Sequence, residues 1–202
     1  MMRLIAVDPA VPAAATLTEA AGVLARDGLV AFPTETFYGL AAHAMSPAAV
    51  KRIFEVKGRP DGKPVLVLVD SIAMVEVLAA RVPPRARELM AAHWPGALTL
   101  VLPAREEVPA EVTAGSGTIG VRLSAHPLAR ALVAALGAPI TAPSANPSGA
   151  PPPTTAQAVR AYFDDRLELI LDGGATPGGA PSTVLDVTVD PPRLLRAGAV
   201  RL

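Results

Sequence analysis

The sequence predicts a mixed α/β fold, arranged as one domain over residues 1–202 with no C-terminal extension domain. Short apolar runs alternate along the chain with longer segments that carry the start and stop signals of helices. A chain of 202 residues suits one ordinary domain and can bury a substantial core. Apolar residues make up 51% of the chain and aromatic residues only 3%, so the core must consist mostly of Ala, Val and Leu.

Capping signals predict the helices. Thr16 and Glu19 have the spacing of a capping box, and Gly28 follows as a stop signal. Ser46 and Pro47 suit the N-cap and the first position of a second helix. We expect helices over residues 16–27, 47–57, 71–80, 84–92, 127–136 and 155–163.

Apolar runs predict the strands. Residues 65–69 are continuously apolar, as in a strand that is buried on both faces. We expect strands over residues 29–32, 65–69, 98–102, 119–123, 139–142, 167–171 and 183–189. The Pro-rich and Gly-rich joints between these elements do not separate two regimes of composition, so we expect them to be loops within one domain.

The composition excludes several classes of protein. The formal net charge is zero and the pI is about 6.8, so any binding of a polyanion must be local. The absence of cysteine excludes disulfides, thiolate zinc sites and a Cys nucleophile. His43, His93 and His126 have no metal-ligand spacing, so we expect no metal held by protein side chains.

The N-terminal residues are apolar only as far as Asp8 and Pro9, which is too short for a signal-peptide core. No run approaches the roughly 18 apolar residues that a membrane span needs. We therefore expect a cytoplasmic protein that does not enter a membrane.

Two Gly-rich segments resemble nucleotide-binding motifs without meeting their requirements. Residues 115–120 fit the dinucleotide fingerprint, but a β-rich segment follows where a helix is needed, and Ile140 stands where an acidic residue would be. In residues 58–63 the glycines are one position too close for a P-loop, and Pro64 replaces the Ser or Thr that binds magnesium. Neither a Rossmann site nor a Walker ATPase is predicted.

All three lysines of the chain lie between Lys51 and Lys63, whereas the other basic residues are Arg. Lys57 continues the apolar stripe of the second helix, seven residues after Val50, so it points into the protein. Burying an unpaired ammonium is costly, which favours a polar cavity completed by a negative ligand. The alternatives are a solvated loop and a Lys57 side chain that extends to solvent.

Two further polar clusters directly follow predicted strands. Residues 142–149 are rich in Ser, Asn and Pro and come after the strand around Ile140, at the strand end where α/β folds commonly bind ligands. Residues 33–40 follow the run at 29–32 in the same way. The composition of residues 142–149 also fits an ordinary turn.

Seven motifs in order along almost the whole chain resemble the YrdC-like threonylcarbamoyl-AMP synthases. They are Phe-Pro-Thr-Glu-Thr-Phe-Tyr-Gly-Leu at 32–40, Lys-Gly-Arg-Pro at 57–60, His-Trp-Pro-Gly at 93–96 with Leu-Thr-Leu-Val at 98–101, Thr-Ile-Gly-Val-Arg-Leu at 118–123, Ala-Pro-Ser-Ala-Asn-Pro-Ser-Gly at 142–149, Pro-Ser-Thr-Val-Leu-Asp at 181–186 and Arg-Ala-Gly at 196–198. The resemblance implies a twisted mixed β-sheet flanked by helices around a basic concave site. It also implies that L-threonine, bicarbonate and ATP give threonylcarbamoyl-AMP and pyrophosphate.

The resemblance implies a role for individual residues. Lys57 and Arg59 would be catalytic, through positioning and charge stabilisation. The residues implied to bind ATP are Lys57, Arg59, Lys63, Thr118, Ser144, Asn146 and Arg196. The residues implied to bind threonine are Thr36, Arg122, the backbone at Ala142, and Ser182. Mg2+ would accompany ATP, held largely by the triphosphate, and Glu35 is a candidate base for the threonine amine or a structural hydrogen-bonding residue.

The implied downstream partner is a complex that transfers the threonylcarbamoyl group to tRNA, and direct contact of this protein with tRNA stays open. Two departures stand out: Leu68 occupies a position where some members carry His, and Ala197 replaces Pro in the usual Arg-Pro-Gly. The alternatives are an enzyme that forms a carbamoyl-adenylate from carbamoyl phosphate and a non-catalytic RNA-binding module.

Overall fold

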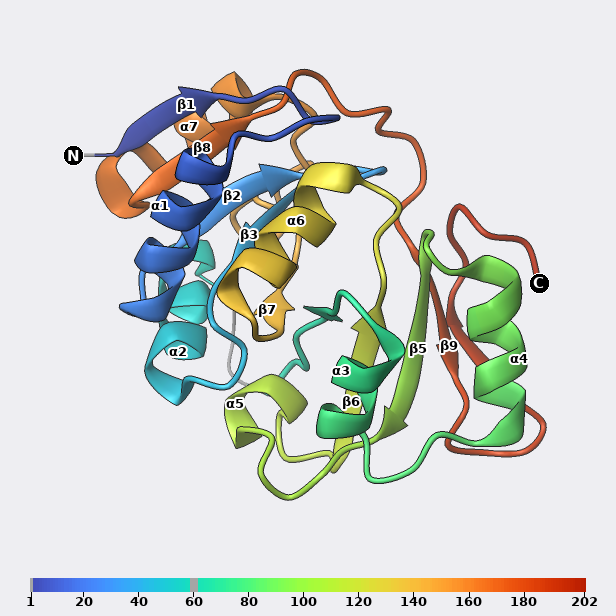
Figure 1. The fold of residues 1–202 in the computed structure, drawn as a ribbon. Coiled ribbons are helices and arrows are strands. Elements are labelled where there is room, and N and C mark those ends of the chain that lie inside the picture. Colours follow the sequence, from blue (N-terminus) through green and yellow to red (C-terminus); the bar gives the residue numbers. More distant parts are fainter. Residues whose placement is uncertain (1, 59–61) are drawn as a thin grey trace.

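The computed structural model describes residues 2–58 and 62–202, in which helices and strands alternate along the chain (Figure 1). The helices are α1 (Ala14–Ala25), α2 (Pro47–Lys57), α3 (Ile72–Leu78), α4 (Pro84–His93), α5 (Ala110–Thr113), α6 (Pro127–Leu136) and α7 (Ala156–Phe163), which continues into the 3-10 turn η1 (Asp164–Arg166). The strands are β1 (Arg3–Ala6), β2 (Val30–Pro33), β3 (Tyr38–Ala41), β4 (Val67–Leu68), β5 (Leu98–Pro103), β6 (Thr118–Arg122), β7 (Ile140–Thr141), β8 (Leu169–Asp172), β9 (Thr183–Asp186) and β10 (Arg193–Arg196).

The strands form two mixed sheets. The smaller sheet has the order β1-β8-β2-β3 and the larger the order β10-β9-β5-β6-β4-β7. The mixed α/β class is therefore confirmed, but the strands are divided between two sheets, where one sheet was expected. Single bridges join the sheets where β3 and the segment after it run beside β7 and the loop that follows, Gly39 opposite Ser144 and His43 opposite Ile140.

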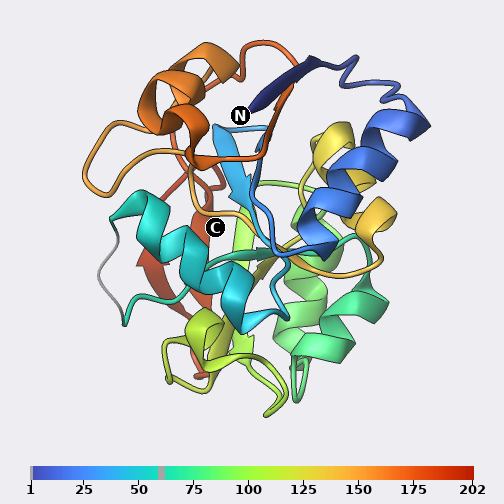
Figure 2. The ribbon, with the colours of Figure 1, turned by 90° about the vertical axis from the view of Figure 1, so that its left-hand side faces the viewer.

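Both faces of the smaller sheet are covered by helices (Figure 2). Val30 and Phe32 of β2 pack in a cluster with α1 and α6, whereas Ala31 belongs to a cluster with α2 and α7. Successive residues of a strand point to opposite faces, so a strand covered on both sides must be apolar throughout. This explains the unbroken apolar run that predicted β2.

In the larger sheet, one face of β5 and β6 packs in an apolar core. Leu98, Leu100 and Leu102 of β5 pack there with α3 and α4, as do Ile119 and Val121 of β6. The residues between them point to the opposite face, and these are Thr99 and Val101 of β5 and Thr118, Gly120 and Arg122 of β6. The polar and small residues in these strands therefore share one surface.

The helix that leads into the lysine cluster begins and ends as predicted. The side chain of Ser46 accepts a hydrogen bond from the Ala49 backbone N–H, and Pro47 takes the first helical position. Gly58 ends the helix with a φ of 56°, a left-handed conformation that glycine adopts without strain.

The predicted start of the first helix is wrong. α1 begins at Ala14, and its N-cap residue Ala13 makes no side-chain cap. Glu19 lies inside the helix, where it pairs with Arg3 of β1, so the spacing of Thr16 and Glu19 was not a capping box. Gly28 does follow the helix, as predicted. Glycine is needed there because a Cβ at this position would lie only 2.8 Å from the Val23 carbonyl oxygen.

Short elements without a periodic pattern were not predicted, and these are β1, β3, α5 and β10. Several predicted strands are shorter than their apolar runs, since β4 includes only Val67–Leu68 and β9 ends at Asp186. Within the described residues, no helix is long and apolar enough to cross a membrane.

Candidate active site

A cavity of about 640 Å³ lies against the face of the larger sheet that is not packed in the core. The sheet contributes Thr99, Val101, Thr118, Gly120, Arg122 and Val184 to its lining. The turn after β2 and the loop after β7 supply the facing walls, including Thr36, Phe37, Ala142, Ser144 and Asn146. The cavity therefore lies between the polar face of one sheet and loops that follow strands of both.

Nine of the predicted site residues line this cavity: Thr36, Lys57, Thr118, Arg122, Ala142, Ser144, Asn146, Ser182 and Arg196. Lys63 is exposed and is not a lining residue. Arg59 lies outside the described residues. The structure thus brings together residues from distant parts of the sequence, while their roles toward ligands stay predictions.

Lys57 is buried, with 5% of its surface exposed, so the alternative in which it extends to solvent is wrong. Its ammonium donates hydrogen bonds to the backbone carbonyls of Ser144 and Asn146, and its own carbonyl accepts one from the Ser148 N–H at 2.7 Å. Both the side chain and the backbone carbonyl of Lys57 thereby connect the end of α2 to the loop after β7.

Backbone hydrogen bonds to neighbouring segments hold the loop after β7 in place. The Ala142 N–H donates to Leu66 and the Ala145 N–H to Tyr38, each at 2.8 Å. Asn146 donates from its side-chain amide to the carbonyls of Pro147 and Ala150. The carbonyl oxygen of that amide is buried and accepts no hydrogen bond from any described residue.

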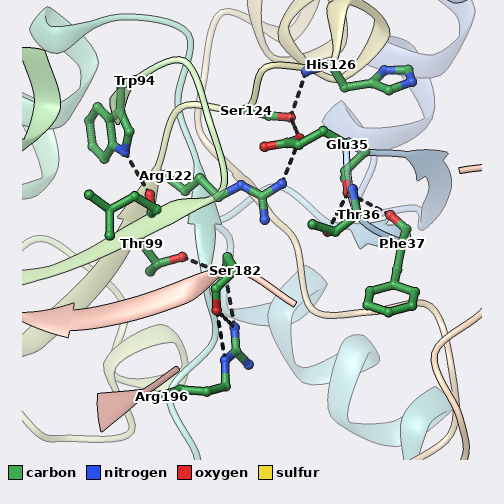
Figure 3. Close-up of polar contacts among 12 residues, drawn as sticks. Glu35, Thr36, Phe37, Trp94, Thr99, Arg122, Ser124, His126, Ser182 and Arg196 are labelled. Carbon is green, nitrogen blue, oxygen red and sulfur yellow. Dashed lines mark hydrogen bonds and ion pairs between the residues drawn. The ribbon is translucent and has the colours of Figure 1, made fainter. Parts of the chain in front are cut away.

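Arg122 extends from the end of β6 toward Glu35 in the turn after β2 (Figure 3). The guanidinium Nη2 lies 2.7 Å from Glu35 Oε2, and only 4% of the Arg122 side chain is exposed. The N–H bonds of Nε and Nη2 are not aligned on any acceptor among the described residues. Arg122 thus has a counterion on the Nη2 side of its guanidinium.

Glu35 also accepts a hydrogen bond from the Ser124 hydroxyl, and the pair lies close to His126 (Figure 3). Burial raises the pKa of Glu35, but the charge of Arg122 and the Ser124 hydrogen bond outweigh burial and hold the pKa below its ordinary value. Burial lowers the pKa of His126, although the charge of Glu35 opposes that shift. A carboxylate with a lowered pKa is a weak base, which counts against Glu35 as the acceptor of a substrate proton.

Ser182 connects β9 to the neighbouring strands on both sides. Its hydroxyl lies 2.9 Å from the Thr99 hydroxyl, and Arg196 of β10 donates to both its hydroxyl and its carbonyl oxygen (Figure 3). Burial and then the charge of Arg122 lower the pKa of Arg196. The two guanidinium groups are therefore close enough to repel each other, and an anion between them would relieve that repulsion.

Within residues 2–58 and 62–202, no three His, Asp or Glu side chains are grouped so that they could hold a metal ion. Leu68 is 1% exposed, packs in the apolar cluster with Ile140 and does not line the cavity. Leu68, which stands where some family members carry His, is therefore part of the apolar core.

Thr99 and Ser124 had no predicted role, yet Thr99 bonds to Ser182 and Ser124 to Glu35 in the hydrogen-bonding network around the cavity. Thr99 alternates with Leu98 and Leu100, and that alternation could have shown that it faces away from the core. Ser124 lies after the strand and had no comparable signal.

Comparison with known proteins agrees with these motifs. Residues 22–198 match the Sua5/YciO/YrdC family model, which is described as telomere recombination. The chain belongs to this family. The resemblance seen in the sequence is thereby confirmed over most of its length.

Relatives with curated names share up to half of their aligned residues with the chain. The threonylcarbamoyl-AMP synthase of Pyrococcus abyssi is 50% identical over 91% of this chain and 54% of that protein. The protein of the same name from Bacillus subtilis is 47% identical over 91% of this chain and 54% of that protein. The chain therefore spans about half the length of these relatives.

The fold is also that of a family member crystallised with a ligand. The structure of P. abyssi Sua5 complexed with L-threonine superimposes with a TM-score of 0.94 at 47% identity, covering 98% of this chain and 58% of that chain. The mixed α/β fold is thus shared over nearly all of the present chain.

Proposed function

We propose that this chain is an L-threonylcarbamoyladenylate synthase, which makes threonylcarbamoyl-AMP and pyrophosphate from L-threonine, bicarbonate and ATP. The observation that carries the proposal is that Lys57, Arg122 and Arg196 line the same cavity, together with small hydroxyl and amide side chains. The names of the relatives, and L-threonine as the ligand of the P. abyssi structure, support it.

The reaction needs no nucleophile from the protein. The threonine amine attacks CO2 and loses a proton, which forms a carbamate. Bicarbonate takes up that proton when it gives CO2 and water, so the overall products are the carbamate and water. A carbamate oxygen then attacks the α-phosphorus of ATP, and the bond from that phosphorus to the bridging oxygen of pyrophosphate breaks. Such a transfer depends mainly on positioning and on the stabilisation of charge.

The cavity offers suitable groups for both substrates. Arg122 has the planar fork that suits the threonine carboxylate, with the Thr36 and Ser182 hydroxyls and the Ala142 backbone beside it. Lys57 would contact the phosphates, and the nucleotide would also be contacted by Thr118, Ser144, Asn146 and Arg196. Lys63 and Arg59 would complete the phosphate contacts from the segment after α2.

Magnesium would enter with ATP. Among the described residues that line the cavity there is no carboxylate, so the oxygen ligands that Mg2+ prefers would come from the triphosphate and water. In this proposal the product passes to a complex that transfers the threonylcarbamoyl group to tRNA in the cytoplasm.

The test is pyrophosphate release from ATP and Mg2+, with threonine and bicarbonate omitted in turn. We expect release only when both are present, with threonylcarbamoyl-AMP identified by mass spectrometry. Release that requires carbamoyl phosphate instead would indicate the carbamoyl-adenylate activity. No release from folded protein, together with RNA binding that weakens steeply with salt, would indicate an RNA-binding module.

A further inference from the structure

Glu35 and Arg122 form an ion pair between the two sheets. Glu35 lies in the turn after β2 of the smaller sheet, and Arg122 ends β6 of the larger sheet. Ser124 donates to the same carboxylate oxygen, and its own oxygen accepts the His126 N–H at 3.2 Å. Two groups therefore contact the carboxylate, Arg122 at the end of β6 and Ser124 in the segment that leads to α6.

The position of Glu35 relative to the cavity argues against direct chemistry. Arg122 and Thr36 line the cavity, whereas Glu35 does not. The carboxylate lies on one side of the guanidinium, and the other terminal nitrogen of Arg122 points toward the space between Thr36 and Ser182 (Figure 3). Glu35 thus contacts Arg122 on the side of the guanidinium that faces away from the cavity.

Burial makes this contact important for the orientation of Arg122. A guanidinium that is 4% exposed has little water to stabilise its charge, so it needs a counterion within the protein. A nearby carboxylate also selects one side-chain conformation, and a bidentate ligand of Arg requires a fixed guanidinium plane.

We propose that Glu35 is a positioning residue that holds the Arg122 guanidinium ready for the carboxylate of the amino-acid substrate and exchanges no proton with that substrate. This inference rests on the proposed function for the identity of the substrate. It replaces the hypothesis that Glu35 is the base for the threonine amine.

The first test is the kinetics of Glu35→Gln, which keeps the size of the side chain and an acceptor for Ser124 but removes the charge. We expect the KM for threonine to rise at least about tenfold, while kcat at saturating threonine and the KM for ATP stay within about twofold. The matched control is Glu168→Gln, since Glu168 pairs with Arg52 at the same 2.7 Å and does not line the cavity. This control should leave the KM for threonine unchanged.

Two results would overturn the proposal. One is an unchanged KM for threonine in Glu35→Gln. The other is a large fall in kcat together with loss of the acidic limb of its pH profile, which would make Glu35 a base. If Glu35→Gln does not fold, Ser124→Ala removes only the second donor to the carboxylate and should raise the KM about threefold. An unchanged KM in Ser124→Ala would then contradict the proposal.

A second measurement needs no substrate and so separates this inference from the proposed function. The Nε–H signal of Arg122 in a ¹H–¹⁵N spectrum, assigned by its loss in Arg122→Lys, should be sharp in the wild type and in Glu168→Gln. It should broaden or disappear in Glu35→Gln, and a sharp, unshifted signal there would refute the positioning role. If the wild type releases no pyrophosphate, the proposed function fails, and this spectrum still decides the role of Glu35.

Discussion

Lys57 and Arg122 line the same cavity and are almost equally buried, yet the partners that the structure describes for them differ in kind. Lys57 donates to two backbone carbonyls of the loop after β7, whereas Arg122 faces the carboxylate of Glu35. Contacts to carbonyls fasten a stretch of backbone, and a carboxylate orients one side chain and balances its charge. The loss of the Lys57 side chain should therefore displace the loop that forms one wall of the cavity. A substitution of Arg122 should affect only the binding of the ligand carboxylate.

The largest expected effect is that of Lys57→Ala. We expect pyrophosphate release to fall at least about a hundredfold, because the variant loses both the proposed phosphate contact and the side-chain hydrogen bonds to the Ser144 and Asn146 carbonyls. The control is Lys51→Ala on the same helix, where the side chain is 64% exposed and pairs with Glu111. Wild-type turnover of a folded Lys57→Ala protein would refute the proposed contact with phosphate. Arg59→Ala is expected to lose most activity in the same assay.

Arg122→Lys should have a more selective effect. It keeps the positive charge opposite Glu35 but loses the planar fork, so we expect kcat/KM for threonine to fall about ten- to a hundredfold. The affinity for ATP, measured by calorimetry, should change little. Arg193→Lys, at an exposed Arg that pairs with Asp186, is the control and should behave as the wild type. An equal loss of ATP affinity in Arg122→Lys would mean that the two ends of the cavity are not separate.

Ser182→Ala should have a smaller effect that tests the Arg196 side of the cavity. The substitution removes the hydroxyl that lies between Thr99 and Arg196, a contribution of about 1 kcal/mol, so kcat/KM for threonine should fall about threefold to tenfold. Ser71→Ala is the control, because it removes the N-cap of α3 and should lower only the melting temperature. Equal kinetics of both variants would remove Ser182 from the proposed threonine site.

The smallest effect concerns stability and pH. The folded-state pKa of Glu35 is lowered, so its ionisation stabilises the fold fully above the ordinary pKa, and this stability is lost as the pH falls through the folded pKa. The difference in unfolding free energy between the wild type and Glu35→Gln should therefore shrink as the pH is lowered from about 6 to about 3. Asp186 also has a lowered pKa, and the comparison with Glu35→Gln cancels its contribution. A difference that grows toward low pH would contradict the lowered pKa of Glu35.

Local signals predicted the elements that have them. Ser46, Pro47 and Gly58 marked both ends of α2, since a cap, a fixed φ and a left-handed residue act within one turn of a helix. The same type of signal failed at Thr16 and Glu19, because Glu19 forms an ion pair with Arg3 of β1 and does not cap the helix. Short strands such as β3 had no signal, because four residues contain too little periodicity.

The contents of the cavity were more predictable than its contacts. Motif resemblance named most of the lining residues, and the alternation in β5 and β6 was visible in the sequence. The partner of Arg122 was not predictable, because Glu35 belongs to the other sheet and its second donor, Ser124, lies 89 positions along the chain. The loop carbonyls that receive Lys57 were equally hidden, since backbone groups carry no sequence signal.

By itself, the sequence determined the α/β class, the boundaries of α2, the inward direction of Lys57 and the residue types available for binding a phosphate and a carboxylate. These properties depend on local conformational preference and on burial of an apolar stripe, which act over a few residues. Only the tertiary structure decided that the strands divide into two sheets, that Lys57 fastens a loop and that Glu35 stands behind Arg122. These contacts require segments far apart in the chain to meet, and the geometry of that meeting depends on the packing of the whole molecule.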